Sequence, residues 1–297
     1  MGGQAVLEGV MMRGASTWAI AVRKPDGEIS VDVREVAGWS DKYNDIPVVR
    51  GVMSLAESLG LGYRALTWSA NQQIPEEDQI SEKALGWAVL PVALVFSAVF
   101  IVIPAFAGHG FSHWFHGSFP IVEGVVRLAL FIGYLLLVGC LKDIRRVFQY
   151  HGAEHKAIAA YENDVELTPQ SAQQFTTAHV RCGTNFLLTV MVLAVLVYSV
   201  IPRPNLWFVI GSRILLTPVI AGLAYEVIRY AAKNMQRRWV RVLVRPGLWL
   251  QRLTTREPDL DQLEVAIASL RAVFTADQTA EVDARVGRRV PAIAPAY

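Results

Sequence analysis

Two histidines and a glutamate form the pattern with the clearest chemical meaning in this sequence. His151 and His155 are four residues apart, so in a helix they lie on the same face, about 6 Å apart along the axis. Glu154 lies between them in the order His-x-x-Glu-His. This order is the inverted form of a zinc-protease signature, in which two imidazoles bind the metal and the carboxylate acts as the base. We therefore predict a metal site at which Glu154 is catalytic.

A zinc ion in a protein needs at least a third protein ligand, and three other side chains are candidates. His179 and Cys182 follow the histidine pair in a segment that can fold back onto the helix, and Glu226 lies near the end of an apolar segment. Imidazole together with thiolate favours Zn²⁺. The predicted metal ligands are His151, His155, His179, Cys182 and Glu226.

A structural role for the histidine pair is the alternative. In that interpretation His151 and His155 form hydrogen bonds with the backbone or with lipid headgroups. Glu154 is then exposed and pairs with Lys156 or with an arginine. No metal is bound in this case, and the His-x-x-Glu-His pattern is a chance match.

Long apolar segments indicate where these residues must lie. Only 18% of the 297 residues are charged and 53% are hydrophobic, whereas soluble domains have roughly 25% charged residues. Four segments are long enough to cross about 30 Å of hydrocarbon as helices. They are residues 84–107, 121–141, 186–201 and 207–232. We predict an α-helical integral membrane protein with about four transmembrane helices, in contact with the lipid bilayer.

The distribution of basic residues predicts the orientation in the membrane. The loop at residues 108–120 contains no Lys or Arg, whereas residues 142–185 and the segment after residue 232 contain several. Basic loops remain in the cytoplasm. Both termini and the metal-site loop, residues 142–185, are therefore expected at the cytoplasmic face of the inner (cytoplasmic) membrane. The net charge of +2 gives no indication of nucleic-acid binding.

The remaining segments are expected to form cytoplasmic structure. Residues 1–82 are predicted to form a small N-terminal α/β module, since alternating runs at 18–22 and 29–33 flank a Pro-Asp-Gly turn. A helix over residues 48–68 packs on this sheet or lies in the bilayer interface.

Residues 83–232 form the predicted membrane domain. The helix that carries the histidine pair is expected to continue the second membrane segment from Leu141. Residues 233–274 are expected to be a cytoplasmic helical segment, with one helix broken at Pro246 and an amphipathic helix after Pro258. Residues 275–297 are expected to be a poorly ordered tail.

Two charge groups lie inside the predicted membrane segments, away from the cytoplasmic ends of those segments. Glu123 and Arg127 are four residues apart in the second segment, and Arg213 lies in the fourth. Charges in lipid face the interior of a bundle and are paired. A structural clamp is one interpretation and a transport route is the other, which the absence of paired broken helices disfavours.

Four separated motifs, in this order, resemble the YqhQ family of bacterial membrane proteins. They are GGQAVLEGVMMR at residues 2–13, HGAEHK at 151–156, HVRCGT at 179–184 and PGLWLQRLTTREP at 246–258. The resemblance extends from residue 2 to about residue 270. It implies an integral membrane protein of unknown function, and members of this family are often described as predicted metal-dependent enzymes. That description rests on the same histidines and supplies no reaction.

Two functional hypotheses follow. The first is a metal-dependent hydrolase at the cytoplasmic face, acting on a membrane protein or on a lipid-linked ester. The second is a non-enzymatic membrane scaffold or assembly factor that contains a structural metal or none and binds a membrane-protein partner.

Overall fold

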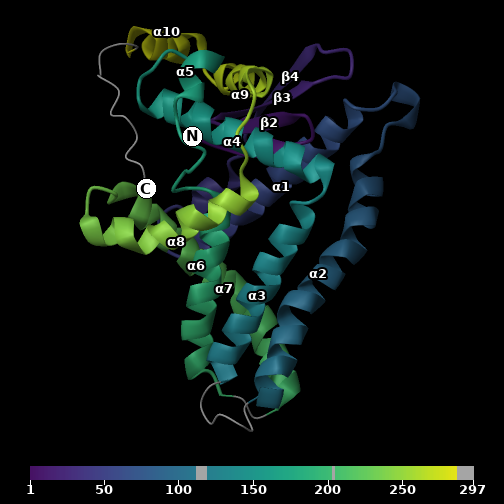
Figure 1. Ribbon diagram of the computed structural model, residues 1–297, viewed down its shortest axis with the longest axis vertical. Coiled ribbons are helices and arrows are strands. Elements are labelled where there is room, and N and C mark those ends of the chain that lie inside the picture. The colour runs from purple at the N-terminus through teal and green to yellow at the C-terminus, as the bar shows by residue number, and fades with distance from the viewer. Residues whose placement is uncertain (112–118, 203–204, 286–297) are drawn as a thin grey trace.

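A bundle of long helices with a sheet-containing region at one end makes up the described part of the chain, residues 1–111, 119–202 and 205–285 of this computed structural model (Figure 1). Four of the described helices are long and apolar enough to cross a membrane: α2 (Glu82–Phe111), α3 (Phe119–Val138), α6 (Gly183–Val200) and α7 (Leu206–Lys233). Only 11% to 22% of the residues in their most apolar windows are buried inside the protein. These helices therefore present an apolar outer surface, as lipid requires. The prediction of about four long apolar helices is confirmed, while their placement in a membrane stays a prediction.

The helix with the histidine pair, α4 (Lys142–Glu162), is separate from α3 and does not continue it. The chain turns at residues 139–141, and Leu141 has an extended backbone immediately before α4. The expected continuous helix was therefore wrong. Because of this turn, α4 runs across the end of the bundle (Figure 1) and presents one side to the ends of the long helices.

An antiparallel sheet lies beyond α4. Its strands are β1 (Gly2–Val6), β2 (Gly9–Arg13), β3 (Thr17–Arg23) and β4 (Ile29–Glu35), in the order β1-β2-β3-β4. The predicted hairpin of β3 and β4 is confirmed. The hairpin of β1 and β2 was not predicted, because glycines at residues 2, 3 and 9 weaken the strand signal.

Helices cover both faces of this sheet. The residues that face α4 and α9 (Leu260–Ala272) are Val10, Met12, Ala19 and Ala21. The residues that face α1 (Val49–Asn71) are Met11, Trp18, Ile20 and Val22. Because side chains alternate between the faces of a strand, burial of both faces explains why β2 and β3 are apolar almost throughout.

Helix α1 also contacts the membrane bundle. A Cβ atom at Gly51 would lie 2.9 Å from the carbonyl oxygen of Gly222 in α7, so these two glycines allow the helices to approach closely. Of the two expected positions for α1, packing on the sheet is the one observed: Leu61 and Ala65 lie in the same buried cluster as the sheet residues.

The C-terminal segments return to the sheet. Helix α8 (Arg238–Thr254) lies crosswise at this end of the bundle (Figure 1) and runs through Pro246, so the expected helix break at that residue was wrong. A proline inside a helix removes one hydrogen bond, here the bond to the carbonyl of Val242, and the helix tolerates this loss. Helix α9 begins with a capping box, in which Asp259 and Gln262 each bond the other's backbone N–H.

Four shorter elements complete the described chain: η1 (Trp39–Tyr43), η2 (Glu76–Asp78), α5 (Pro169–Gln173) and α10 (Ala276–Arg285). The expected poorly ordered tail at residues 275–297 contains α10, and residues 286–297 lie outside the described part. The sheet, α4 and α9 pack together although they come from three of the predicted segments. The predicted boundaries at residues 82, 232 and 274 stay a prediction.

Candidate metal centre

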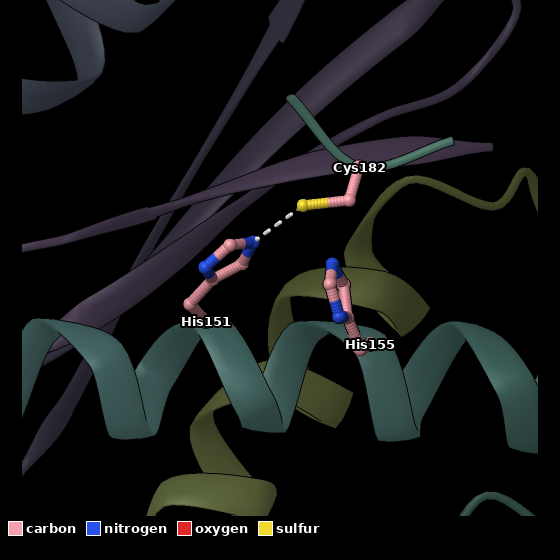
Figure 2. Close-up of side chains that lie close together, drawn as sticks. All are labelled: His151, His155 and Cys182. Carbon is pink, nitrogen blue, oxygen red and sulfur yellow. Dashed lines mark hydrogen bonds between the residues drawn. The ribbon is translucent and has the colours of Figure 1, made fainter. Parts of the chain in front are cut away.

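Helix α4 brings two imidazoles together with one thiol. His151 and His155 project from α4 toward Cys182, which immediately precedes α6 (Figure 2). The Nε2 atom of His151 lies 3.3 Å from the Sγ atom of Cys182. The two imidazole ring centroids are 4.5 Å apart. One ligand atom from each of these three residues lies within 4.8 Å of the others, and we call these residues the His/Cys group.

Backbone carbonyls hold both imidazoles. The Nδ1 atom of His151 lies 2.8 Å from the carbonyl oxygen of Thr254, and Nδ1 of His155 lies 2.5 Å from that of Thr177. A carbonyl only accepts, so each Nδ1 carries a proton, and Nε2 of the neutral ring offers its lone pair, which at His151 faces the thiol of Cys182. Metal-binding histidines almost always donate their other ring N–H to a carbonyl or carboxylate in this way.

The thiol of Cys182 is buried at the start of α6. Its Sγ accepts a hydrogen bond from the backbone N–H of Thr184 at 3.4 Å. Burial raises the pKa of this thiol to about 11, so it remains protonated at neutral pH. A bound cation reverses this effect, because a thiol that coordinates a metal is deprotonated.

Glu154 is buried beside the His/Cys group, at 5% exposure. Burial raises the pKa of its carboxyl to about 7, while His151 and a hydrogen bond from the N–H of Gly3 act in the opposite direction. A Cβ atom at Gly3 would lie 2.9 Å from the Cγ atom of Glu154, so the strand can approach this closely only as glycine. The alternative of an exposed Glu154 paired with Lys156 does not agree with this structure, since Lys156 pairs with Glu257 at 2.7 Å.

A pocket of about 440 Å³ contains these side chains. Its walls come from β1, from α4 and from residues 179–184, and they include Glu154 and all of the His/Cys group. The group therefore lines a pocket that is large enough for a small molecule or a short chain segment.

His179 lies next to the His/Cys group without being part of it. Its ring centroid is 5.6 Å from that of His155, and its Nε2 lies 3.4 Å from an oxygen of Glu162. Burial lowers the pKa of His179 to about 4, so the ring is neutral at pH 7.

The structure does not bring Glu226 to the centre. Its carboxylate accepts two hydrogen bonds from Arg50, at 2.6 Å from Nε and 2.5 Å from Nη2. The group that the described residues form comprises His151, His155 and Cys182.

Sequence reasoning missed the residues that hold the ligands in place. Besides the carbonyls of Thr177 and Thr254, the side chain of Gln251 bonds both the N–H and the carbonyl of His179, at 2.9 and 2.8 Å. Gln251 is fully buried. Gln251 and Thr254 belong to the motif at residues 246–258, which is visible in the sequence. The sequence did not indicate, however, that this motif contacts the histidines.

The donor set suits a borderline-soft divalent ion. Zinc binds imidazole nitrogen at about 2.0 Å and thiolate at about 2.3 Å, so a tetrahedral site places N and S roughly 3.5 Å apart. The observed 3.3 Å between Nε2 of His151 and Sγ of Cys182 agrees with this spacing. A modest movement of His155 would complete the set. The residues therefore fit Zn²⁺.

Together the fold and the site define a class: a protein with four helices suited to span a membrane and a His/Cys group at one end of the bundle. The family model described as "Protein of unknown function (DUF1385)" matches residues 46–276. The chain is also 33% identical over 308 residues to "Uncharacterized protein YqhQ" of Bacillus subtilis (strain 168), covering 97% of this chain and 96% of that protein. No solved structure matches the chain. The chain belongs to the DUF1385 family, which confirms the resemblance to YqhQ and leaves metal dependence as a proposal.

Proposed function

We propose that this protein is a membrane-embedded metal-dependent hydrolase with its active site at the cytoplasmic face. One observation carries the proposal: three ligand atoms lie within 4.8 Å of one another in a pocket that also contains Glu154. A structural zinc site normally has four protein ligands, whereas a catalytic site has three and keeps one position open. The His/Cys group supplies three protein ligands, as a catalytic site does.

Each residue has a defined role in this proposal. His151, His155 and Cys182 hold the ion, and the carbonyls of Thr254 and Thr177 orient the two imidazoles. A bound Zn²⁺ supplies a Lewis acid that polarises the bond to be cleaved.

Glu154 takes a proton from the attacking water and returns it to the leaving group. In the metal-free protein burial raises the pKa of this carboxyl to about 7. A cation bound beside it would favour the carboxylate, which is the form that accepts the proton of the water. The walls of the pocket position the substrate and limit the access of other water molecules.

The place of the pocket favours a substrate that is itself in or on the membrane. Cys182 immediately precedes α6, one of the four candidate spans, so the pocket lies at the end of the bundle. A peptide bond in a membrane protein and a lipid-linked ester both meet this condition.

A scaffold with a structural metal is the second candidate, and the position of His179 favours it. Its ring lies 5.6 Å from that of His155, so a side-chain rotation could bring it in as a fourth ligand. The metal would then tie α4 to residues 179–182, and the protein would bind a membrane-protein partner without catalysis.

Metal content of the purified full-length protein tests the site. Elemental mass spectrometry should find about one zinc ion per chain in the wild type and none in His151→Ala/His155→Ala, because two of three ligands are lost. Glu226→Gln is the matched control and should retain the metal. If the wild type and the double variant both lack metal, the site does not exist.

Two measurements separate the enzyme from the scaffold. If the protein is an enzyme, Glu154→Gln should keep the metal but fail to complement a deletion strain. If the protein is a scaffold, the same variant should complement the strain fully. In a cobalt-substituted sample, His179→Ala should leave the absorption spectrum unchanged if the site has three protein ligands. A changed spectrum would favour the closed structural site.

A further inference from the structure

A second buried site lies between the long helices, at the end of the bundle away from the sheet. Glu123 and Arg213 are each 1% exposed, and Arg127 is 12% exposed. Arg213 bonds both oxygens of Glu123, with Nε to Oε1 at 3.0 Å and Nη2 to Oε2 at 2.6 Å. Arg127 shares Oε1 of the same carboxylate at 2.7 Å.

One carboxylate thus serves two guanidinium groups. Glu123 is the sole acidic residue of the sequence between residues 83 and 142. Between residues 183 and 233 the sole acidic residue is Glu226, which pairs with Arg50. The cluster of Glu123, Arg127 and Arg213 therefore carries a net charge of +1 inside the helical bundle. An unbalanced charge at such a place is costly in lipid, and it favours a bound anion.

Among the described residues, Arg127 pairs with one carboxylate, that of Glu123, which it shares with Arg213, and its Cζ lies 5.8 Å from the centroid of the Tyr198 ring. The bidentate pair of Arg213 and Glu123 is neutral by itself. Arg127 donates from Nη2 to Glu123 and from Nε to the carbonyl of Phe100 at 3.1 Å. Within the described residues its Nη1 donates no hydrogen bond, so two N–H groups remain available.

A pocket of about 200 Å³ adjoins these two guanidinium groups. Arg127, Arg213 and Tyr198 form one part of its wall, and the Tyr198 ring centroid lies 3.9 Å from Cζ of Arg213. Phe96 and Met191 line another part, nearer the middle of α2 and α6. The pocket is therefore cationic near the far end of the bundle and apolar toward its middle.

We propose that this pocket binds a lipid whose headgroup carries one negative charge. A phosphodiester carries one negative charge, which balances the net charge of +1 on the cluster. Its oxygens accept hydrogen bonds from the available N–H groups of Arg127. The first part of an acyl chain then lies along Phe96 and Met191, in the direction that a lipid of the nearby leaflet would take. A small inorganic anion would leave this apolar part unfilled.

Lipid binding to the full-length protein in detergent tests the proposal. Native mass spectrometry should retain one phosphatidylglycerol per chain, and this lipid should raise the melting temperature more than phosphatidylcholine or inorganic phosphate does. Arg127→Gln leaves a neutral pair behind, so it should fold and bind phosphatidylglycerol about tenfold more weakly or worse. Arg245→Gln, at an exposed position of α8, is the matched control and should bind as the wild type does.

Three outcomes would overturn the proposal. Equal binding by Arg127→Gln would place the lipid elsewhere on the protein. Equal stabilisation by inorganic phosphate would make this a small-anion site, and equal binding of phosphatidylcholine would mean that charge does not matter. Met191→Trp provides a second variant if Arg127→Gln does not fold: it fills the pocket with both arginines in place, and undiminished lipid binding to it would also contradict the proposal.

Discussion

Burial acts in opposite directions on the titratable side chains of the metal centre. It lowers the pKa of His155 well below its ordinary value and that of His179 to about 4, while it raises the pKa of Glu154 to about 7. In each case the neutral form is favoured, because a charge is costly where water is excluded. Without an ion these groups therefore form a nearly neutral site, and metal binding must remove the proton from Cys182.

This effect on Glu154 predicts how the stability of the metal-free protein depends on pH. The carboxyl has a pKa of about 7 in the folded protein and an ordinary value of 4.5. The contribution of the neutral carboxyl to the stability of the folded protein is therefore fully present below pH 4.5 and is lost as the pH rises through about 7. Glu154→Gln removes the charge. Above pH 7 the variant should be more stable than the wild type by roughly 3 kcal/mol at most, with little difference near about pH 4.5. Thermal unfolding in a chelator, at several pH values, measures this difference. Equal stability at high pH would show that Glu154 is not buried.

At the scale of elements, the centre depends on how closely α4 approaches the segment after α8. A Cβ atom at Gly152 would lie 2.1 Å from the carbonyl oxygen of Arg256 and 3.2 Å from Cγ2 of Thr177. Gly152 follows His151, and the two segments that it contacts supply the carbonyls that orient the imidazoles. Close packing and ligand orientation therefore have the same structural origin.

Gly152→Ala should disturb both the packing of α4 and the orientation of the two imidazoles. The added methyl group forces α4 away from residues 254–257, at a cost of about 1–3 kcal/mol in stability, and it displaces the carbonyls of Thr254 and Thr177. We expect a lower melting temperature and a weaker affinity for zinc, measured by competition with a chelating dye. Gly183→Ala is the control, since a Cβ atom there has no neighbour within 4 Å. Wild-type zinc affinity in Gly152→Ala would contradict the role of these carbonyls.

At the scale of the whole molecule, the two ends of the bundle differ in kind. The sheet, α4, α8 and α9 lie at one end, with the His/Cys group and most of the basic residues (Figure 1). At the other end α2 and α6 end and α3 and α7 begin (Figure 1). Because basic segments remain in the cytoplasm, we propose that the sheet end is cytoplasmic.

Cysteine labelling of intact cells tests this orientation. Gly110→Cys lies at the far end in an exposed position with open space around it, and Asp26→Cys lies in the exposed turn between β3 and β4. Both are placed in a Cys140→Ser background, since Cys140 is exposed and Cys182 is buried. A maleimide that cannot cross membranes should label Gly110→Cys and leave Asp26→Cys unlabelled until the cells are opened. The reverse pattern would invert the proposed topology.

The sequence alone determined the features that arise from short-range patterns. Apolar length predicted the four long helices, and the alternating runs beside the Pro-Asp-Gly turn predicted β3 and β4, because helix and strand periodicities act over a few residues. The spacing of His151 and His155 predicted their shared face for the same reason. The family motifs were also visible, since they are local strings.

Only the tertiary structure decided which residues meet. The bonds of His155 to Thr177, His151 to Cys182 and His151 to Thr254 join positions 22, 31 and 103 residues apart. No local spacing encodes such contacts: they follow from the turn before α4 and from the return of the C-terminal segments to the sheet. This is why Cys182 joined the histidines while Glu226, expected at the same level of the membrane, paired with Arg50. The depth at which Glu154 is buried, and hence its pKa, likewise depends on strand β1, whose Gly3 lies 151 residues earlier in the chain.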